Sequence, residues 1–98
     1  MNKLALGTVQ FGMKYGIANN SSKFSLKDIS KILNLAKQNK ILTLDTAIDY
    51  GLSETYLGKQ NLEDFKIITK LPEMPQDIND IKSWVFNEIK HSLERLNQ

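Results

Sequence analysis

The segment from Ile41 to Asp45 constrains the fold of this chain more than any other. Its aliphatic residues fall on both faces of an extended strand, and the run ends abruptly in a carboxylate. A strand that is apolar on both faces is typical of a parallel sheet that helices cover. We therefore expect an α/β fold that is built around this strand.

Two further apolar runs flank this strand in the sequence. The run Leu4–Val9 predicts a first strand, and the run Phe65–Lys70 predicts a third strand that stops before two prolines. Gly7, Gly12 and Gly16 indicate that the first strand opens into a loop whose backbone passes close to another group, either at a turn or at a cofactor.

Helical segments alternate with these strands. Ser25 and Asp28 have the spacing of a capping box, so a helix should begin there and end at Asn39 in a left-handed conformation. Ser53 can cap a short helix that runs to about Gly58. The apolar positions that should be buried in the first helix are Leu26, Ile29, Ile32, Leu33 and Ala36.

A long helix should follow the third strand, with Asp77 or Asp80 as its cap. Its expected buried stripe consists of Ile81, Trp84, Val85, Ile89, Leu93 and Leu96. The resulting order of strands and helices indicates βαβ units with right-handed crossovers and a parallel sheet. We expect one domain that spans residues 1–98.

Composition limits the classes of partner. Thirteen basic and eleven acidic residues are spread along the chain, and the net charge of +2 predicts neither nucleic-acid binding nor a membrane surface. The chain has no cysteine, which excludes disulfides, thiolate metal sites and a cysteine nucleophile, and no metal site is expected. No apolar segment reaches the length of a membrane span or a signal-peptide core, so we expect a cytoplasmic protein.

The candidate site lies at the carboxyl ends of the strands, where parallel α/β folds gather their functional groups. Thr8, Asp45 and Lys70 occupy such positions. Because side chains alternate along a strand, Asp45 and Lys70 point to the same side if the more aliphatic neighbouring positions face the helices. A carboxylate beside an ammonium keeps both groups charged.

Tyr50 is the phenol within reach of this pair. An ammonium close to a phenol favours the phenolate and lowers the pKa of a phenol from its usual value of about 10. A phenol that is tuned in this way can donate a proton near neutral pH. The pattern therefore predicts that Tyr50 is a general acid and that Lys70 and Asp45 tune it.

A series of short motifs runs through almost the whole chain. In order, the motifs are Leu6-Gly7-Thr8 with Gly12, Leu44-Asp45-Thr46-Ala47, Tyr50-Gly51, Ser53-Glu54, Leu57-Gly58 and Thr69-Lys70-Leu71-Pro72. In order and spacing, this series resembles the amino-terminal portion of the aldo-keto reductase family. The resemblance implies the first three units of an incomplete TIM (β/α)8 barrel.

The same resemblance implies an oxidoreductase that, in its full-length form, reduces a small-molecule carbonyl to an alcohol with NADPH or NADH. The family's catalytic aspartate, tyrosine and lysine fall on Asp45, Tyr50 and Lys70. By the same analogy Thr8 and Asp45 lie near the nicotinamide ribose. Gln10 and Phe11 then stand at the wall of the substrate pocket.

The family's fourth catalytic residue, a histidine after the fourth strand, has no counterpart in this chain. His91 lies inside the last predicted helix, where we expect it to be exposed. A complete barrel takes about 250 residues, so we expect this piece to be inactive alone. We also expect it to self-associate through the exposed edges of its strands.

Two other interpretations stay open at this point. A truncated or split reductase could act only as a binding or assembly module. Alternatively, an unrelated small α/β domain could use Asp45 and Lys70 as a structural ion pair. The placement of Tyr50 and Lys70 relative to Asp45 favours catalysis over a purely structural role for Asp45, and the binding or assembly module stays open.

Overall fold

The computed structural model describes residues 3–12 and 24–98, so the expectation for Gly16 lies outside the described residues. In chain order the elements are β1 (Leu6–Gly7), α1 (Val9–Gly12), α2 (Leu26–Gln38), β2 (Thr43–Asp45), α3 (Ser53–Gly58), β3 (Lys66–Ile68) and α4 (Ile81–Leu96). The predicted alternation of strands and helices is confirmed. One element was not predicted: α1 is a single helical turn where the sequence predicted a loop.

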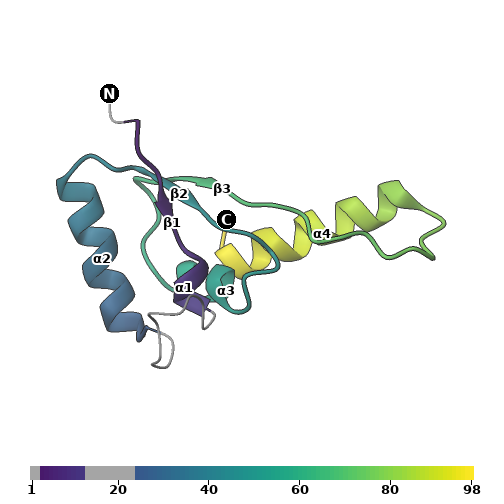
Figure 1. Cartoon of the computed structure of the whole chain (residues 1–98), viewed down its shortest axis with the longest axis horizontal. Helices are drawn as coiled ribbons and strands as arrows, with labels where there is room; N and C mark the ends of the chain where they lie inside the picture. The colour runs from purple at the N-terminus through teal and green to yellow at the C-terminus, as the bar shows by residue number, and fades with distance from the viewer. Residues whose placement is uncertain (1–2, 13–23) are drawn as a thin grey trace.

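The three strands form one parallel sheet in the order β1-β2-β3, as predicted. Leu6 pairs with Leu44 and Leu44 pairs with Ile67, so an apolar row crosses the sheet. In Figure 1, α2 lies at one end of the molecule and α4 extends from the opposite end, with α1 and α3 between them. The molecule is accordingly elongated, with principal extents of 45 × 33 × 24 Å.

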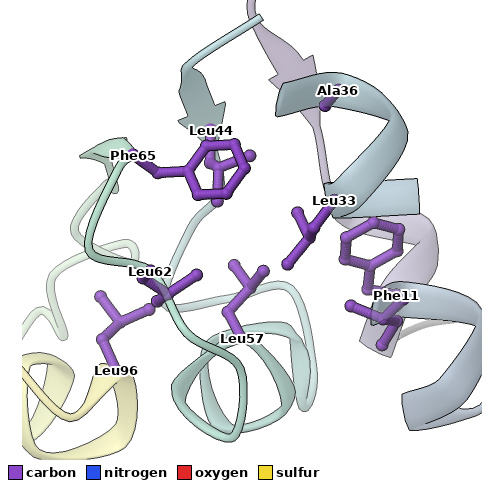
Figure 2. Packing of buried hydrophobic residues seen from close by; sticks show 9 residues of the cluster. Phe11, Leu33, Ala36, Leu44, Leu57, Leu62, Phe65 and Leu96 are labelled. Atoms are coloured by element: carbon purple, nitrogen blue, oxygen red, sulfur yellow. The ribbon is translucent and has the colours of Figure 1, made fainter. Parts of the chain in front are cut away.

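The hydrophobic core lies where the sheet meets α2 and α3. Figure 2 shows that Leu33 from α2, Leu44 from β2 and Leu57 from α3 point toward one another. Leu44 and Leu57 are completely buried. Because Leu44 faces the helices, alternation turns its neighbour Asp45 to the other side of the sheet.

The amino-terminal cap of α2 is the predicted capping box. Asp28 donates its backbone N–H to Ser25 Oγ at 3.1 Å, and Ser25 donates its backbone N–H to Asp28 Oδ2 at 3.2 Å. The expected burial of Leu26 is wrong, because Leu26 is the first residue of α2 and the core begins one turn later at Ile29.

The carboxyl end of α2 differs from the expectation. Asn39 has a φ of −99° and the left-handed residue is Lys40, with a φ of 61°. The Asn39 side chain donates to the Leu35 carbonyl at 2.8 Å, and the same carbonyl also accepts the Asn39 backbone N–H at 3.2 Å. The prediction of a left-handed Asn39 was therefore wrong by one residue.

The largest departure concerns the packing of α4. Its cap is Asp80, whose Oδ1 accepts from the Ser83 backbone N–H at 3.0 Å. Of the predicted buried stripe only Leu96 is buried, whereas Ile81, Ile89 and Leu93 are exposed. The helix projects beyond the sheet in Figure 1, so only its last turns can reach the core.

Candidate active site

The paired ends of β2 and β3 bring the predicted site residues together. Pairing continues past the strand ends, since Thr46 N–H donates to the Ile68 carbonyl at 2.8 Å and Ile48 N–H donates to the Lys70 carbonyl at 3.1 Å. Lys70 is therefore held beside the segment that follows Asp45. The backbone pairing places a cation next to a carboxylate at one edge of the sheet.

Lys70 contacts both other members of the predicted trio. Its Nζ donates to Asp45 Oδ1 at 2.7 Å and to the Thr46 carbonyl at 2.7 Å. It also lies 3.5 Å from Tyr50 Oη and 5.0 Å from the centroid of the tyrosine ring. The expected proximity of these three side chains, which we call the rim site (Asp45, Tyr50 and Lys70), is confirmed. Their catalytic roles stay predictions.

The electrostatics of the rim site keep Lys70 charged. The hydrogen bond to Asp45 raises the pKa of Lys70 above its usual value of 10.5, and the contact with Tyr50 adds to this effect against the opposing effect of burial. The side chains of Lys70 and Asp45 are 46% and 40% exposed. An ion pair this exposed contributes only about 0–1 kcal/mol to stability. The pair is thus open to a ligand and adds little to the fold.

A tight turn presents the Tyr50 phenol to Lys70. Tyr50 N–H donates to the Ala47 carbonyl at 3.1 Å, and the Tyr50 carbonyl accepts from Ser53 N–H at 3.1 Å. The next residue, Gly51, has a φ of 60°, a left-handed conformation that favours glycine. In the Tyr50-Gly51 motif, the turn therefore favours glycine at position 51, and the tyrosine supplies the phenol.

Close packing between α1 and α3 explains Gly12. A Cβ at Gly12 would lie 2.1 Å from the backbone nitrogen of Ser53, so only glycine lets the two helices approach this closely. The predicted close backbone approach is confirmed for Gly12, where the group approached is the start of α3, and is wrong for Gly7 within the described chain, where a Cβ would meet nothing within 4 Å.

The structure corrects the prediction for Thr8. Its side chain is completely buried, and both its N–H and its Oγ1 donate to the Asp45 carbonyl, at 3.0 and 3.1 Å. A side chain without exposed surface cannot contact a cofactor. Thr8 instead ties the end of β1 to the residue that carries the rim carboxylate.

Ser53 also differs from its prediction. The N-cap position of α3 is occupied by Leu52, without a side-chain hydrogen bond, and Ser53 is the first residue of the helix. The buried Ser53 hydroxyl donates to the Thr8 carbonyl at 2.8 Å. Its part in the site is therefore to join α3 to the end of β1.

Gln10 and Phe11 were both predicted to line a substrate pocket, and the structure separates them. Phe11 is 3% exposed and packs in the core, with its ring edge-on to Phe24 at a centroid distance of 5.9 Å. Consecutive residues of a helix point about 100° apart, so α1 turns Phe11 inward while Gln10 is exposed. The pocket-wall position is wrong for Phe11 and stays a prediction for Gln10.

Sequence reasoning missed the importance of Glu54, which it named as part of the Ser53-Glu54 motif. The structure buries this carboxylate beneath the rim site, where it binds Thr69, Ser92 and Arg95. We call these residues the Glu54 cluster (Glu54, Thr69, Ser92 and Arg95). A serine and an arginine three residues apart on one helix face were the available signal, because such a spacing suits a shared acceptor.

Other parts of the described chain add no catalytic candidate. His91 is exposed on α4, as expected. Within residues 3–12 and 24–98, no group of three or more His, Cys, Asp or Glu residues is arranged to hold a metal ion. In the same ranges, none of the helices has the length and apolar character that crossing a bilayer requires.

Comparison with known proteins links this geometry to one family. The sequence model of the aldo/keto reductase family matches residues 3–98. Two solved structures, both of proposed aldo-keto reductases from Pseudomonas aeruginosa, match 96% of the chain. One has a TM-score of 0.76 at 32% identity and the other a TM-score of 0.72 at 30% identity. The chain spans only 38% and 36% of their lengths. No curated protein matches the chain.

Proposed function

This chain belongs to the aldo/keto reductase family, and from that premise we propose that residues 1–98 form one domain made of the first three units of an incomplete (β/α)8 barrel. Family membership excludes the unrelated α/β domain that the sequence had left open. The proposed activity of the full-length enzyme is reduction of a small-molecule carbonyl to an alcohol with NADPH or NADH. The observation that carries this proposal is the contact of Lys70 with both Asp45 and Tyr50 at the sheet edge.

Each member of the rim site has a distinct role in this proposal. Tyr50 Oη donates a proton to the carbonyl oxygen of the substrate. Lys70, held as an ammonium by Asp45, stabilises the negative charge that develops on the phenol as the proton leaves. The nicotinamide, when bound, supplies the hydride.

The residues of this chain fit the nicotinamide end of such a cofactor. Asp45 uses Oδ1 for Lys70, and its side chain remains 40% exposed, so the carboxylate has surface with which to accept a ribose hydroxyl. Thr8 cannot join it because its hydroxyl is buried against the Asp45 carbonyl. Gln10 is exposed and is retained as a substrate contact.

We propose that the 98-residue chain does not turn over substrate alone. The rim site offers a proton donor and its partners, but the family's catalytic histidine has no equivalent here, since the sole histidine, His91, is exposed on α4. The chain also spans 38% or less of the two solved relatives. The remaining contacts to cofactor and substrate would come from the rest of the barrel. The protein is proposed to work in the cytoplasm.

The test of the activity is Tyr50→Phe in the full-length enzyme. Loss of the hydroxyl should lower kcat by at least about 100-fold, because general acid catalysis contributes that much, while the Kd for NADPH stays nearly unchanged. Tyr56→Phe is the matched control, since Tyr56 lies on α3 and packs against the core. Turnover that survives Tyr50→Phe would refute the role given to Tyr50.

A fluorescence titration with NADPH separates an enzyme fragment from an assembly module. If the rim site accepts the nicotinamide end, adding the chain should quench or shift the nicotinamide emission. Asp45→Asn should then weaken the response. Emission that does not change at any protein concentration would favour a module that only binds or assembles with other chains.

We further propose that the isolated chain associates with a second copy of itself through the free edge of β3. In the described residues β3 pairs only with β2. A groove of about 450 Å³ lies beside it, with apolar walls that include Ile67, Leu71, Ile89 and Leu93. An edge strand beside an apolar groove invites a further strand.

Light scattering after size-exclusion chromatography tests this association. The chain should elute as a dimer or larger species, and Ile89→Lys should shift it toward the monomer by placing a charge in the groove. Lys31→Gln on α2, at the other end of the molecule in Figure 1, is the control and should leave the mass unchanged. A well-behaved monomer at high concentration would contradict the proposal.

A further inference from the structure

The Glu54 cluster lies directly behind the rim site. Among the described residues, Glu54 is the only charged residue that is buried, with 2% of its surface exposed. Its Oε2 accepts from Thr69 Oγ1 at 2.8 Å and also from Ser92 Oγ, and its Oε1 accepts from Arg95 Nε at 2.8 Å. Three donors satisfy the carboxylate, which is the condition for burying it.

These hydrogen bonds leave Glu54 in two directions. One arm reaches Thr69, which directly precedes Lys70 at the end of β3. The other arm reaches Ser92 and Arg95, both on α4. The bond to Thr69 leads to the rim site, whereas the bonds to Ser92 and Arg95 lead to α4. Substitutions at Thr69 and at Ser92 can therefore test the two connections separately.

The arm to Thr69 connects the two segments that carry the phenol and the ammonium. Glu54 lies in the first turn of α3, four residues after Tyr50, and the turn between them is closed by the bond from Ser53 N–H to the Tyr50 carbonyl. The bond between Glu54 and Thr69 therefore cross-links the turn that holds Tyr50 to the strand end that holds Lys70.

Small displacements matter at this position. The distance from Lys70 Nζ to Tyr50 Oη is 3.5 Å, at the outer limit of a hydrogen bond. The side chain of Lys70 is long and 46% exposed, so its packing restrains it little. The bonds from its Nζ to Asp45 and Thr46, and the pairing of its carbonyl with Ile48 N–H, all depend on where the end of β3 holds its backbone. A shift there would lengthen both the contact with Tyr50 and the pair with Asp45.

We propose that Glu54 is a positioning residue of the rim site, and that its buried carboxylate sets the placement of Lys70 against Asp45 and Tyr50 through Thr69. The inference rests on the proposed function, since it assigns Glu54 a role through residues to which that proposal gives the chemistry. Glu54 touches neither substrate nor cofactor. Its effect passes through the strand end.

Trace acetylation of the chain measures the placement of Lys70 directly. At about pH 8, well below the ordinary lysine pKa, only the free amine reacts, so the hydrogen bond to Asp45 should slow labelling of Lys70 relative to exposed Lys82. Peptide mass spectrometry gives the ratio of the two rates. Because unfolding would itself free Lys70 while Lys82 is already exposed, the ratio is compared only among variants that urea denaturation shows to be folded under the labelling conditions.

Thr69→Val is the decisive variant, because it keeps the shape of the side chain and removes only its hydroxyl. We expect it to raise the relative labelling of Lys70 by about threefold, the size of effect that one lost hydrogen bond can produce. Thr69→Ser should restore the slow rate. Ser92→Ala, which removes a donor on the other arm, should leave the ratio near that of the unmodified chain.

The outcomes distinguish this inference from the proposed function. If Asp45→Asn accelerates the labelling of Lys70 and Thr69→Val does not, the rim site stands and the role of Glu54 is overturned. If Asp45→Asn also has no effect, the ion pair on which both proposals depend is absent, and both are overturned. Glu54→Gln, which keeps the side-chain volume, should act like Thr69→Val wherever circular dichroism shows a folded chain.

Discussion

The rim site and the Glu54 cluster each join a carboxylate to a cation, yet they differ in exposure. Asp45 and Lys70 are 40% and 46% exposed, and one carboxylate oxygen of Asp45 accounts for their pairing. Glu54 is almost completely buried, and both of its oxygens accept hydrogen bonds from protein side chains. The two carboxylates therefore occupy opposite environments, whereas the cations Lys70 and Arg95 are both partly exposed, at 46% and 34%.

The difference in exposure indicates that the rim site can bind a ligand and that the Glu54 cluster has a structural role. An exposed pair has surface left for a ligand and adds little to stability, whereas a pair whose carboxylate is buried, as Glu54 is beside the 34% exposed Arg95, becomes costly to break. The rim site has the first set of properties and the Glu54 cluster has the second. We therefore expect substitutions in the Glu54 cluster to lower the free energy of unfolding much more than substitutions in the rim site.

The largest effect is expected from Glu54→Ala. It leaves the Arg95 guanidinium without its carboxylate and removes the acceptor of Thr69 and Ser92, so the free energy of unfolding should fall by about 3–5 kcal/mol. Urea denaturation followed by circular dichroism measures the loss. The control Glu63→Ala, at an exposed loop position, should stay within about 0.5 kcal/mol. If Glu54→Ala lowered the free energy of unfolding no more than Asp45→Asn, the expected difference between the buried and the exposed carboxylate would be refuted.

A second effect should come from Gly58→Ala, which acts on the helix contact beside the Glu54 cluster. A Cβ at Gly58 would lie 1.9 Å from the Arg95 carbonyl oxygen, so α4 must move away from α3. We expect a loss of about 1–3 kcal/mol, as for other overpacked contacts. Gly7→Ala is the matched control, because a Cβ there meets nothing within 4 Å. Equal thermal midpoints for the two variants would argue against the close contact.

Asp45→Asn should change stability much less. The pair that it removes is exposed, so urea denaturation should show a loss of less than about 1 kcal/mol. The same substitution should strongly reduce turnover in the full-length enzyme, because Lys70 loses the group that keeps it in place. A stability loss as large as that of Glu54→Ala would mean that Asp45 supports the fold.

The smallest expected effect is a dependence on alkaline pH. Because Asp45 raises the pKa of Lys70 above 10.5 in the folded state, the pair stabilises the fold fully below that value. The contribution is lost as the pH rises through the higher pKa of the folded chain. The difference in unfolding free energy between the unmodified chain and Asp45→Asn should shrink in this range. A difference that does not change with pH would rule out this linkage.

The parts of the fold that were predicted correctly depend on interactions between residues close together in the sequence. The capping box of Ser25 and Asp28 and the cap at Asp80 each involve residues within three positions of each other. The pairing of Asp45 with Lys70 was also foreseen, because strand alternation and parallel pairing extend a local rule across the sheet. Tyr50 was predicted as the third partner because it is the phenol within reach of this pair, and the family motifs placed the catalytic tyrosine on the same residue.

The errors concern residues whose surroundings come from distant segments. Thr8 was placed at the cofactor, but its hydroxyl is taken by a carbonyl 37 positions later. Phe11 was placed in a pocket wall, but α1 turns its ring into the core. The stripe of α4 has the pattern of a buried face, yet the helix extends past the sheet that would cover it.

By itself, the sequence determined the alternation of strands and helices, the parallel sheet and the chemistry available at the strand ends. These follow from periodicity and capping, which act between residues close together in the chain. Only the tertiary structure decided which carboxylate is exposed at the rim and which is buried behind it. Burial depends on what packs against a side chain from elsewhere, and no local pattern around Asp45 or Glu54 contains that information.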